Sequence, residues 1–218
     1  MTVEEIYRNL YSQAWRKSAS ICDVRTVCVE YKTCADKSTT DVIDFDDYAE
    51  QYKQQKGIGE RPQSVDAVAI DASRQCLLLI EKKTWYQFYQ HQLVNARNET
   101  DKKNAIENKI NEYTAEIANK YVQSKVMIAH FTGVQDVVDT VRHVLVFLTE
   151  LAVDYPDPMG GFATSLGLLT TTSSFDIRKY TVKKMQDSVT ALPAPKKEYV
   201  YCKQLDEYVR TLSLPTAS

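Results

Sequence analysis

The stretch VDAVAI-DASRQ-CLLLIEKK, which covers Val65–Lys83, decides the fold of this chain. Its two outer runs, Val65–Ile70 and Cys76–Lys83, are rich in Val, Leu and Ile and are too short for typical helices, so they predict two β-strands. Between them, Asp71–Gln75 supplies polar turn residues. The stretch therefore predicts a β-hairpin, and the charged residues at its open end decide what the hairpin can do.

The register of this hairpin determines which charged residues share a face. If Asp71 faces Cys76 across the turn, Asp66 lies directly opposite Glu81, with Cβ atoms about 5 Å apart. Lys83 is on the same face as Glu81, because successive side chains of a strand alternate between the two faces. A turn one residue longer would put the two acids on opposite faces. The shorter turn therefore predicts a cluster of two acids and one lysine.

The rest of the hairpin is apolar on both faces. Val68, Ile70, Leu77 and Leu79 share one face with the acids, and Ala67, Ala69, Leu78 and Ile80 lie on the other. Strands that are covered on both faces belong to sheets that lie between helices. The sequence therefore predicts an α/β fold.

The two facing acids are costly on such strands, because like charges repel each other and resist removal from water. A Mg²⁺ ion held by the carboxylate oxygens of Asp66 and Glu81 would offset both costs. Lys83 could then orient or deprotonate a nearby water, or stabilise charge that develops on a phosphate. The same residues also fit a simpler interpretation, in which acids at strand ends face solvent and Glu-x-Lys occurs by chance.

At Asp66, Glu81 and Lys83 the chain resembles the PD-(D/E)xK, or restriction-endonuclease-like, nuclease superfamily. The resemblance implies an αβββαβ core, with a mixed sheet flanked by helices. It also implies that the chain is an endonuclease that hydrolyses phosphodiester bonds in DNA or RNA with Mg²⁺ or Mn²⁺. Asp66 and Glu81 would hold the metal, and Lys83 would act on the attacking water.

The chain also departs from the pattern of that superfamily. Val65 stands where the motif has proline, and Gln87 is followed four positions later by His91 rather than by the tyrosine of a Gln-x-x-x-Tyr motif. Many members add an acid from the first core helix. Glu50 is the candidate for that acid in this chain, and Glu60 is the second choice.

Length and composition indicate one domain. The chain has 218 residues, 44% of them hydrophobic, which is enough for a substantial core. We expect a single domain over residues 1–218, with an N-terminal helix and a C-terminal strand and helix added to the core. No run approaches the length of a membrane-spanning helix, and the N-terminus lacks the features of a signal peptide. We therefore expect a cytoplasmic protein without membrane contact.

The charge of the chain argues against a strongly basic nucleic-acid-binding surface, and its cysteine spacing argues against a zinc site. The net charge is −2, whereas dedicated nucleic-acid binders often carry a strong positive excess. Pairs of lysines at 82–83, 102–103, 183–184 and 196–197 predict either a local phosphate track or an ordinary solvated surface. The five cysteines lack the spacing of a zinc site, and we expect them to be reduced thiols.

Periodicity predicts the remaining elements. Before the hairpin they are an amphipathic helix over 3–18, an extended segment over 20–31 and a helix over 44–55. After it they are a helix or irregular segment over 85–97, a helix from Thr100 to about Gln123 and a strand over 144–148. The C-terminal part has loops over 154–161 and 170–174, a break at Pro193 and Pro195, a strand over 198–202 and a closing helix from Leu205.

Two classes of function fit these predictions. The first is the metal-dependent nuclease, which would act on nucleic acid and would form a homodimer if it cuts both strands of a duplex. The second is a non-catalytic protein-binding module on the same fold, such as an inhibitor, an immunity-type partner or a regulatory subunit. The mild acidity of the chain favours the second class, and the retained motif favours the first.

Overall fold

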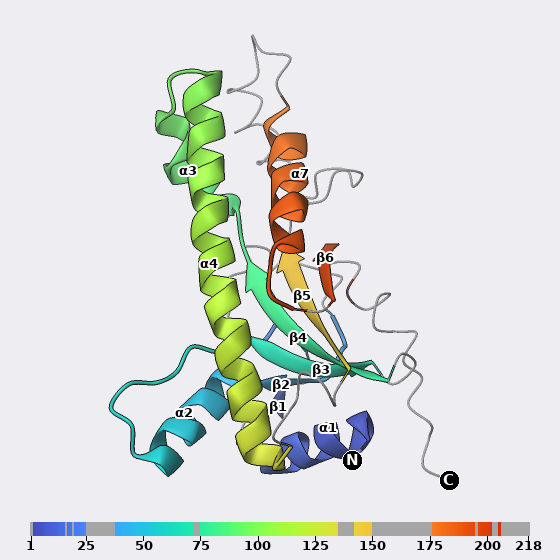
Figure 1. The fold of residues 1–218 in the computed structure, drawn as a ribbon. Coiled ribbons are helices and arrows are strands. Elements are labelled where there is room, and N and C mark those ends of the chain that lie inside the picture. Colours follow the sequence, from blue (N-terminus) through green and yellow to red (C-terminus); the bar gives the residue numbers. More distant parts are fainter. Residues whose placement is uncertain are drawn as a thin grey trace.

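The computed structural model describes residues 2–15, 17–18, 20–24, 38–71, 75–134, 142–149, 176–194, 196–201 and 205. In these residues a mixed β-sheet is flanked by helices (Figure 1). The elements in chain order are α1 (Val3–Gln13), β1 (Lys17–Ser18), β2 (Val42–Asp44), α2 (Phe45–Lys56), β3 (Ala67–Asp71), β4 (Cys76–Lys83), α3 (Tyr86–His91), η1 (Leu93–Asn95), α4 (Glu99–Thr132), β5 (His143–Thr149), α7 (Ile177–Thr190) and β6 (Lys197–Tyr201). The protein is therefore of the α/β class, as the sequence predicts.

The sheet has the strand order β1-β2-β3-β4-β5-β6 within the described part of the chain. Strands β1 to β4 are antiparallel to one another, whereas β4 pairs with β5, and β5 with β6, in parallel. Parallel neighbours need a crossover connection, and the connection from β4 to β5 contains α4. The predicted order of hairpin, long helix and strand in one sheet is thereby confirmed.

The hairpin of β3 and β4 has the shorter of the two turns considered above. Asp71 pairs with Cys76, so the register that sets Asp66 opposite Glu81 is confirmed. Gln75 ends the turn with a φ of 52°, in the left-handed region. The structure thus has the one of the two registers that puts both acids on the same face.

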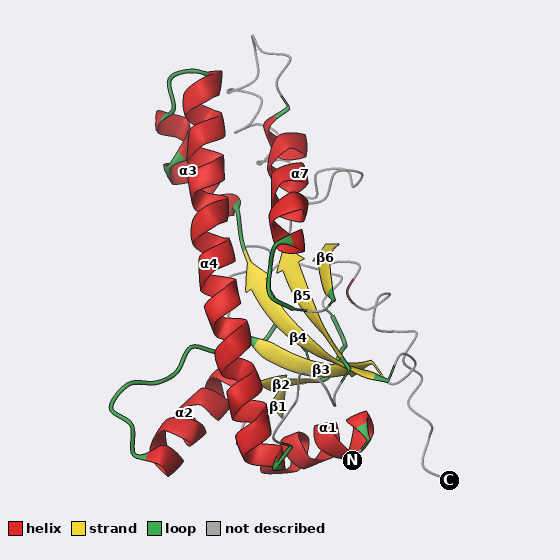
Figure 2. Cartoon of the chain, viewed as in Figure 1, coloured by secondary structure: helices red, strands yellow, loops and turns green. Residues whose placement is uncertain are grey.

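The two faces of the hairpin enter two different apolar clusters, as alternation requires. One face packs against residues of α1, α2, α4 and α7, which lie on the same side of the sheet (Figure 2). The hairpin residues in this cluster are Val68, Leu77 and Leu79. The opposite face carries Ala67, Ala69, Leu78 and Ile80 and is covered by Ile21, Val24 and Leu205. Both faces of the hairpin are thus buried.

Helix α4 is longer than the sequence predicts, and its start is different. Its N-cap is Asn98, whose side chain accepts a hydrogen bond from the backbone N–H of Asp101, so the predicted cap at Thr100 is wrong. The helix continues past Gln123 to Gly133, which ends it with a φ of 73°. The polar residues near 123 do not stop it, because a further turn of buried residues, Met127, Ile128 and Phe131, extends its contact with the core.

The first helix is shorter than predicted. It ends at Gln13 rather than near residue 18, because Lys17–Ser18 leaves the helix to pair with β2 at the edge of the sheet. The segment that follows is not extended where it is described. Over Ser20–Val24 the chain turns, and the amide of Asp23 donates to the carbonyl of Ser20 at 3.1 Å. Residues 25–31 of that prediction lie outside the described residues.

Several other predictions are confirmed. They are the helix of α2, the short helical segments of α3 and η1, and strands β5 and β6. Helix α7 was not predicted, because basic residues interrupt its apolar pattern in the sequence. Its buried residues are Ile177, Val182, Met185 and Val189. The predicted loops over 154–161 and 170–174, and the closing helix beyond Leu205, lie outside the described residues. Among the described helices, none has the length and apolar character needed to cross a membrane.

Candidate active site

Asp66 and Glu81 converge at the open end of the hairpin. Asp66 directly precedes β3, and the amide N–H of Lys82 donates to its Oδ2 atom at 2.8 Å. The Nζ atom of Lys120 lies 2.7 Å from Oε1 of Glu81 and 3.7 Å from Oδ1 of Asp66, so one ammonium group reaches both carboxylates. Both acids are buried, with exposed fractions of 1% for Asp66 and 0% for Glu81.

Lys83 joins the same cluster, as the alternation of β4 predicts. Its Nζ atom lies 2.9 Å from Oε1 of Glu81 and 2.8 Å from Oε2 of Glu116. The same ammonium group lies 5.1 Å from the ring centroid of Tyr113, which adds a cation–π contact. The structure therefore brings together all three residues of the sequence motif.

The middle lysine of the Glu-Lys-Lys sequence has a different environment. The side chain of Lys82 points away from the acids, and its Nζ atom donates to the carbonyl oxygens of Ile21 at 3.3 Å and Val24 at 2.9 Å. Because its backbone amide holds Asp66 while its side chain holds the turn on the other face, Lys82 links the site to the second apolar cluster.

Two residues of the cluster come from α4 and were not predicted. Glu116 and Lys120 are four positions apart, so they share one face of the helix, and their side chains pair at 3.2 Å. A signal for Lys120 exists in the sequence. It lies three residues after Ile117 and next to Tyr121, on the apolar stripe of the helix, where a charged residue needs buried partners.

The rings that follow β4 fix this arrangement. Trp85 is fully buried and contacts the rings of Phe88, Tyr89 and Tyr113. The hydroxyl of Tyr113 donates to the carbonyl of Thr84 at 3.1 Å, directly after Lys83. Trp85, Phe88 and Tyr89 are thus packed in the core, and they tie the end of β4 to α4.

With all three acids ionised, the cluster contains one more negative charge than positive charge, since Asp66, Glu81 and Glu116 face Lys83 and Lys120. Burial, and then repulsion from Asp66, raises the pKa of Glu81 to about 7, although both lysines act in the opposite direction. Burial alone lowers the pKa of Lys120, but the surrounding carboxylates outweigh burial and raise it. Hydrogen bonding to Lys83 contributes to a lowered pKa of Glu116 despite its partial burial.

The donor set fits a divalent cation. Oε2 of Glu81 is buried and has no hydrogen-bond partner within the described part of the chain, so it retains lone pairs for a ligand. Asp66 provides a second carboxylate on the same side. The described residues contain no group of three or more His, Cys, Asp or Glu side chains placed to hold a metal. A cation held by Asp66 and Glu81 would complete its shell with water or phosphate, as Mg²⁺ commonly does.

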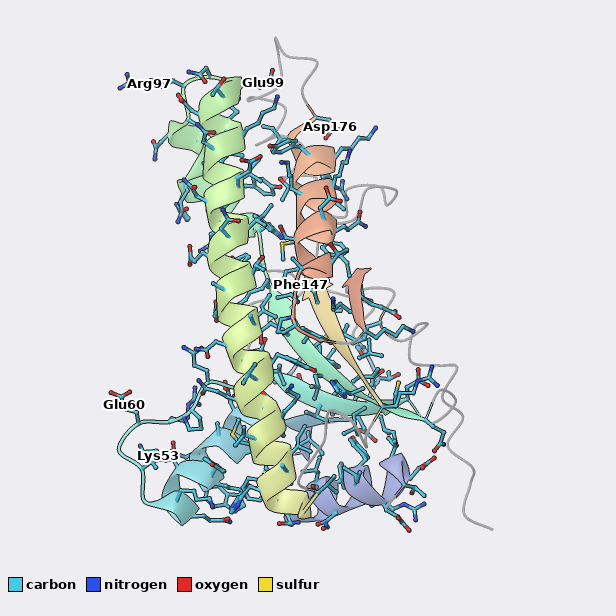
Figure 3. The ribbon with its side chains drawn as sticks, in the orientation of Figure 1. Lys53, Glu60, Arg97, Glu99, Phe147 and Asp176 are labelled. Carbon is cyan, nitrogen blue, oxygen red and sulfur yellow. The ribbon has the colours of Figure 1, made fainter. Side chains whose placement is uncertain are left out.

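The candidate additional acids do not join this cluster. Glu50 lies on α2, where it pairs with Lys53 at 3.9 Å, and its side chain is 40% exposed. Glu60 is exposed in the segment after α2 and points away from the body of the protein (Figure 3). The third acid of the site is instead Glu116, which comes from α4 rather than from an earlier helix.

Comparison with known proteins finds no match for this chain among family models, curated proteins or solved structures.

Proposed function

We propose that this protein is a metal-dependent nuclease that hydrolyses phosphodiester bonds in DNA or RNA. The observation that carries the proposal is the buried pair of Asp66 and Glu81, with Lys83 beside it and Oε2 of Glu81 left without a hydrogen-bond partner. The element order gives further support. The elements α1, β2, β3, β4, α4 and β5 follow the αβββαβ order of restriction-endonuclease-like cores, with β1, α2, α3 and η1 as additional elements between them.

Each residue of the cluster has a distinct task in this proposal. Asp66 and Glu81 would hold Mg²⁺ or Mn²⁺, which supplies a Lewis acid for the phosphate and favours deprotonation of the attacking water. The backbone amide of Lys82 orients Asp66. Lys83 is held between Glu81 and Glu116, and its ammonium group can donate hydrogen bonds to the attacking water or to a phosphate oxygen.

A cleavage assay tests this proposal. Single-stranded DNA, duplex DNA and RNA are incubated with the protein in Mg²⁺, in Mn²⁺ and in a chelator. We expect cleavage that the chelator abolishes and that Glu81→Ala and Lys83→Met each remove. Lys103→Met is a matched control, because Lys103 pairs with Glu99 on an exposed part of α4. Cleavage by Glu81→Ala at the wild-type rate would assign the hydrolytic site to other residues.

A second candidate is a non-catalytic protein-binding module, and one observation favours it. Lys120 already reaches both acids, so the cluster has a cation without any metal. One lysine in each of two basic pairs is also neutralised by an acid, since Lys184 pairs with Glu107 and Lys196 with Glu198. Calorimetric titration with Mn²⁺ separates the two candidates. The nuclease should bind the ion and lose that heat in Glu81→Ala, whereas a module with vestigial acids should give no heat.

The nuclease proposal includes a statement about assembly. One Asp-Glu-Lys set addresses one phosphodiester at a time, so cleavage of both strands calls for two copies of the chain, which a two-fold homodimer would provide. Light scattering during duplex cleavage checks this expectation. A monomer that makes concerted double-strand breaks would refute it, and a monomer that only nicks or cuts single strands would indicate a different substrate.

A further inference from the structure

We propose that Lys120 is a tethered counter-ion, which occupies the cation position between Asp66 and Glu81 and is displaced when a divalent ion binds. This role rests on the proposed function, because it concerns the metal site of the same cluster. It adds a residue that lies outside the Asp-Glu-x-Lys motif and a competition that the motif does not predict.

The position of the ammonium group is the first observation. Nζ of Lys120 lies 2.7 Å from Oε1 of Glu81, 3.7 Å from Oδ1 of Asp66 and 3.2 Å from Oε1 of Glu116. Three carboxylates thus surround one cation, and the lysine side chain is only 6% exposed. A divalent ion held by Oε2 of Glu81 and by Asp66 would lie beside this ammonium group and carry a charge of the same sign.

The second observation is that Lys120 has another partner available. Glu116 is one helical turn earlier on α4 and is 34% exposed, so it lies toward solvent relative to the two strand acids. Its Oε1 atom pairs with Lys120 while its Oε2 atom pairs with Lys83. The flexible lysine chain can therefore leave Glu81 and Asp66 and keep its ion pair with Glu116.

The charge balance gives the displacement a physical reason. Without Lys120, the two facing acids would lose an ammonium group that reaches both of them, so their mutual repulsion would destabilise the empty site. With a divalent ion present, an ammonium group left in its original place would face a like charge at close range. The tethered lysine thus keeps the site assembled without metal and weakens the affinity for metal.

Calorimetric titration with Mn²⁺ on the full chain tests this role, using the wild type, Lys120→Met and the control Lys103→Met. Methionine keeps most of the length of the side chain and removes the charge. We expect Lys120→Met to bind Mn²⁺ at least about tenfold more tightly than the wild type, because a unit charge about 4 Å away changes binding by more than that factor at moderate dielectric. Lys103→Met should bind with wild-type affinity. Lys120→Met should also have a lower melting temperature in chelator and a larger rise on addition of Mn²⁺.

A second measurement uses the wild type, since Lys120→Met could fail to fold without an ion. Lysine acylation followed by mass spectrometry reports which ammonium groups are accessible. We expect labelling of Lys120 to rise several-fold on addition of Mg²⁺ or Mn²⁺, whereas labelling of exposed Lys103 should not change. Recovery of folded Lys120→Met by Mn²⁺ would support the proposal in the same way.

The outcomes separate this role from the proposed function. If the wild type binds Mn²⁺ but Lys120→Met binds no more tightly, or if Lys120 labelling is unchanged while the ion binds, the counter-ion role is overturned and the nuclease proposal stands. If neither protein binds Mn²⁺ and Lys120 labelling is unchanged, both proposals fail. Binding by Lys120→Met alone would show that the lysine blocks the site permanently, which overturns both its displacement by the ion and a metal-dependent activity of the wild type.

Discussion

Replacing Glu81 with glutamine should stabilise the metal-free protein, and the gain should depend on pH. Glu81 is 0% exposed and faces Asp66, so its ionised form is held in an unfavourable environment. Glutamine keeps the shape of the side chain and removes the charge. The two lysines keep partners in the variant, because Lys83 still pairs with Glu116, and Lys120 with Glu116 and Asp66.

The magnitude follows from the pKa of Glu81. Burial and the charge of Asp66 raise this pKa from 4.5 to about 7 in the folded state. The folded protein therefore holds the proton more tightly than the unfolded chain. The stability from this group is complete below pH 4.5, falls as the pH rises from 4.5 to about 7, and levels off above that. At about 1.4 kcal/mol per pKa unit, the wild type loses about 3 kcal/mol across this window, a loss that Glu81→Gln does not share.

Urea unfolding in chelator at pH 4.5 and pH 8 measures the effect. The difference in free energy of unfolding between Glu81→Gln and the wild type should grow by about 3 kcal/mol between these two pH values. Glu112→Gln is the control, because the Glu112 side chain is 62% exposed and pairs with Lys109 on the surface of α4. An equal difference at both pH values would refute the raised pKa of Glu81. With saturating Mn²⁺ the wild type should have the higher free energy of unfolding, since it keeps both carboxylates and the variant does not.

Three further predictions concern the helices and the motif lysine. Gly57→Ala should lower the free energy of unfolding by about 1 kcal/mol in urea, because Gly57 has a φ of 63° at the end of α2. The control Gly59→Ala should be close to neutral, because Gly59 has open space around it. Tyr48→Phe should cost about 1 kcal/mol by thermal or urea unfolding, because the buried hydroxyl donates to the carbonyl of Leu10, and an unchanged midpoint would show that this hydrogen bond contributes nothing. Lys83→Met should retain the calorimetric heat of Mn²⁺ binding while losing cleavage, and loss of the heat would make Lys83 a residue that assembles the metal site.

The sequence alone determines the hairpin, and it places the two acids on one face for the shorter of two turn lengths. The two apolar runs are adjacent in the chain, and the length of the polar turn between them decides which residues face each other. Once Asp71 pairs with Cys76, Asp66 must lie opposite Glu81. The alternation of β4 then places Lys83 on the same face without any long-range information. Strand β5 and most of α4 were also predictable, because long periodic patterns identify such elements.

Only the tertiary structure decides what surrounds these residues. Glu116 and Lys120 are more than thirty residues beyond the hairpin, and the packing of α4 across the sheet determines which of its turns meets Glu81. The same packing removes Glu81 from water and so sets its pKa. The early end of α1 likewise follows from strand pairing at the edge of the sheet, which overrides the helical pattern near residue 17. Local periodicity and turn length therefore specify the motif, whereas contacts between distant segments specify its charge balance, because a helix face acquires its partners only when the crossover is formed.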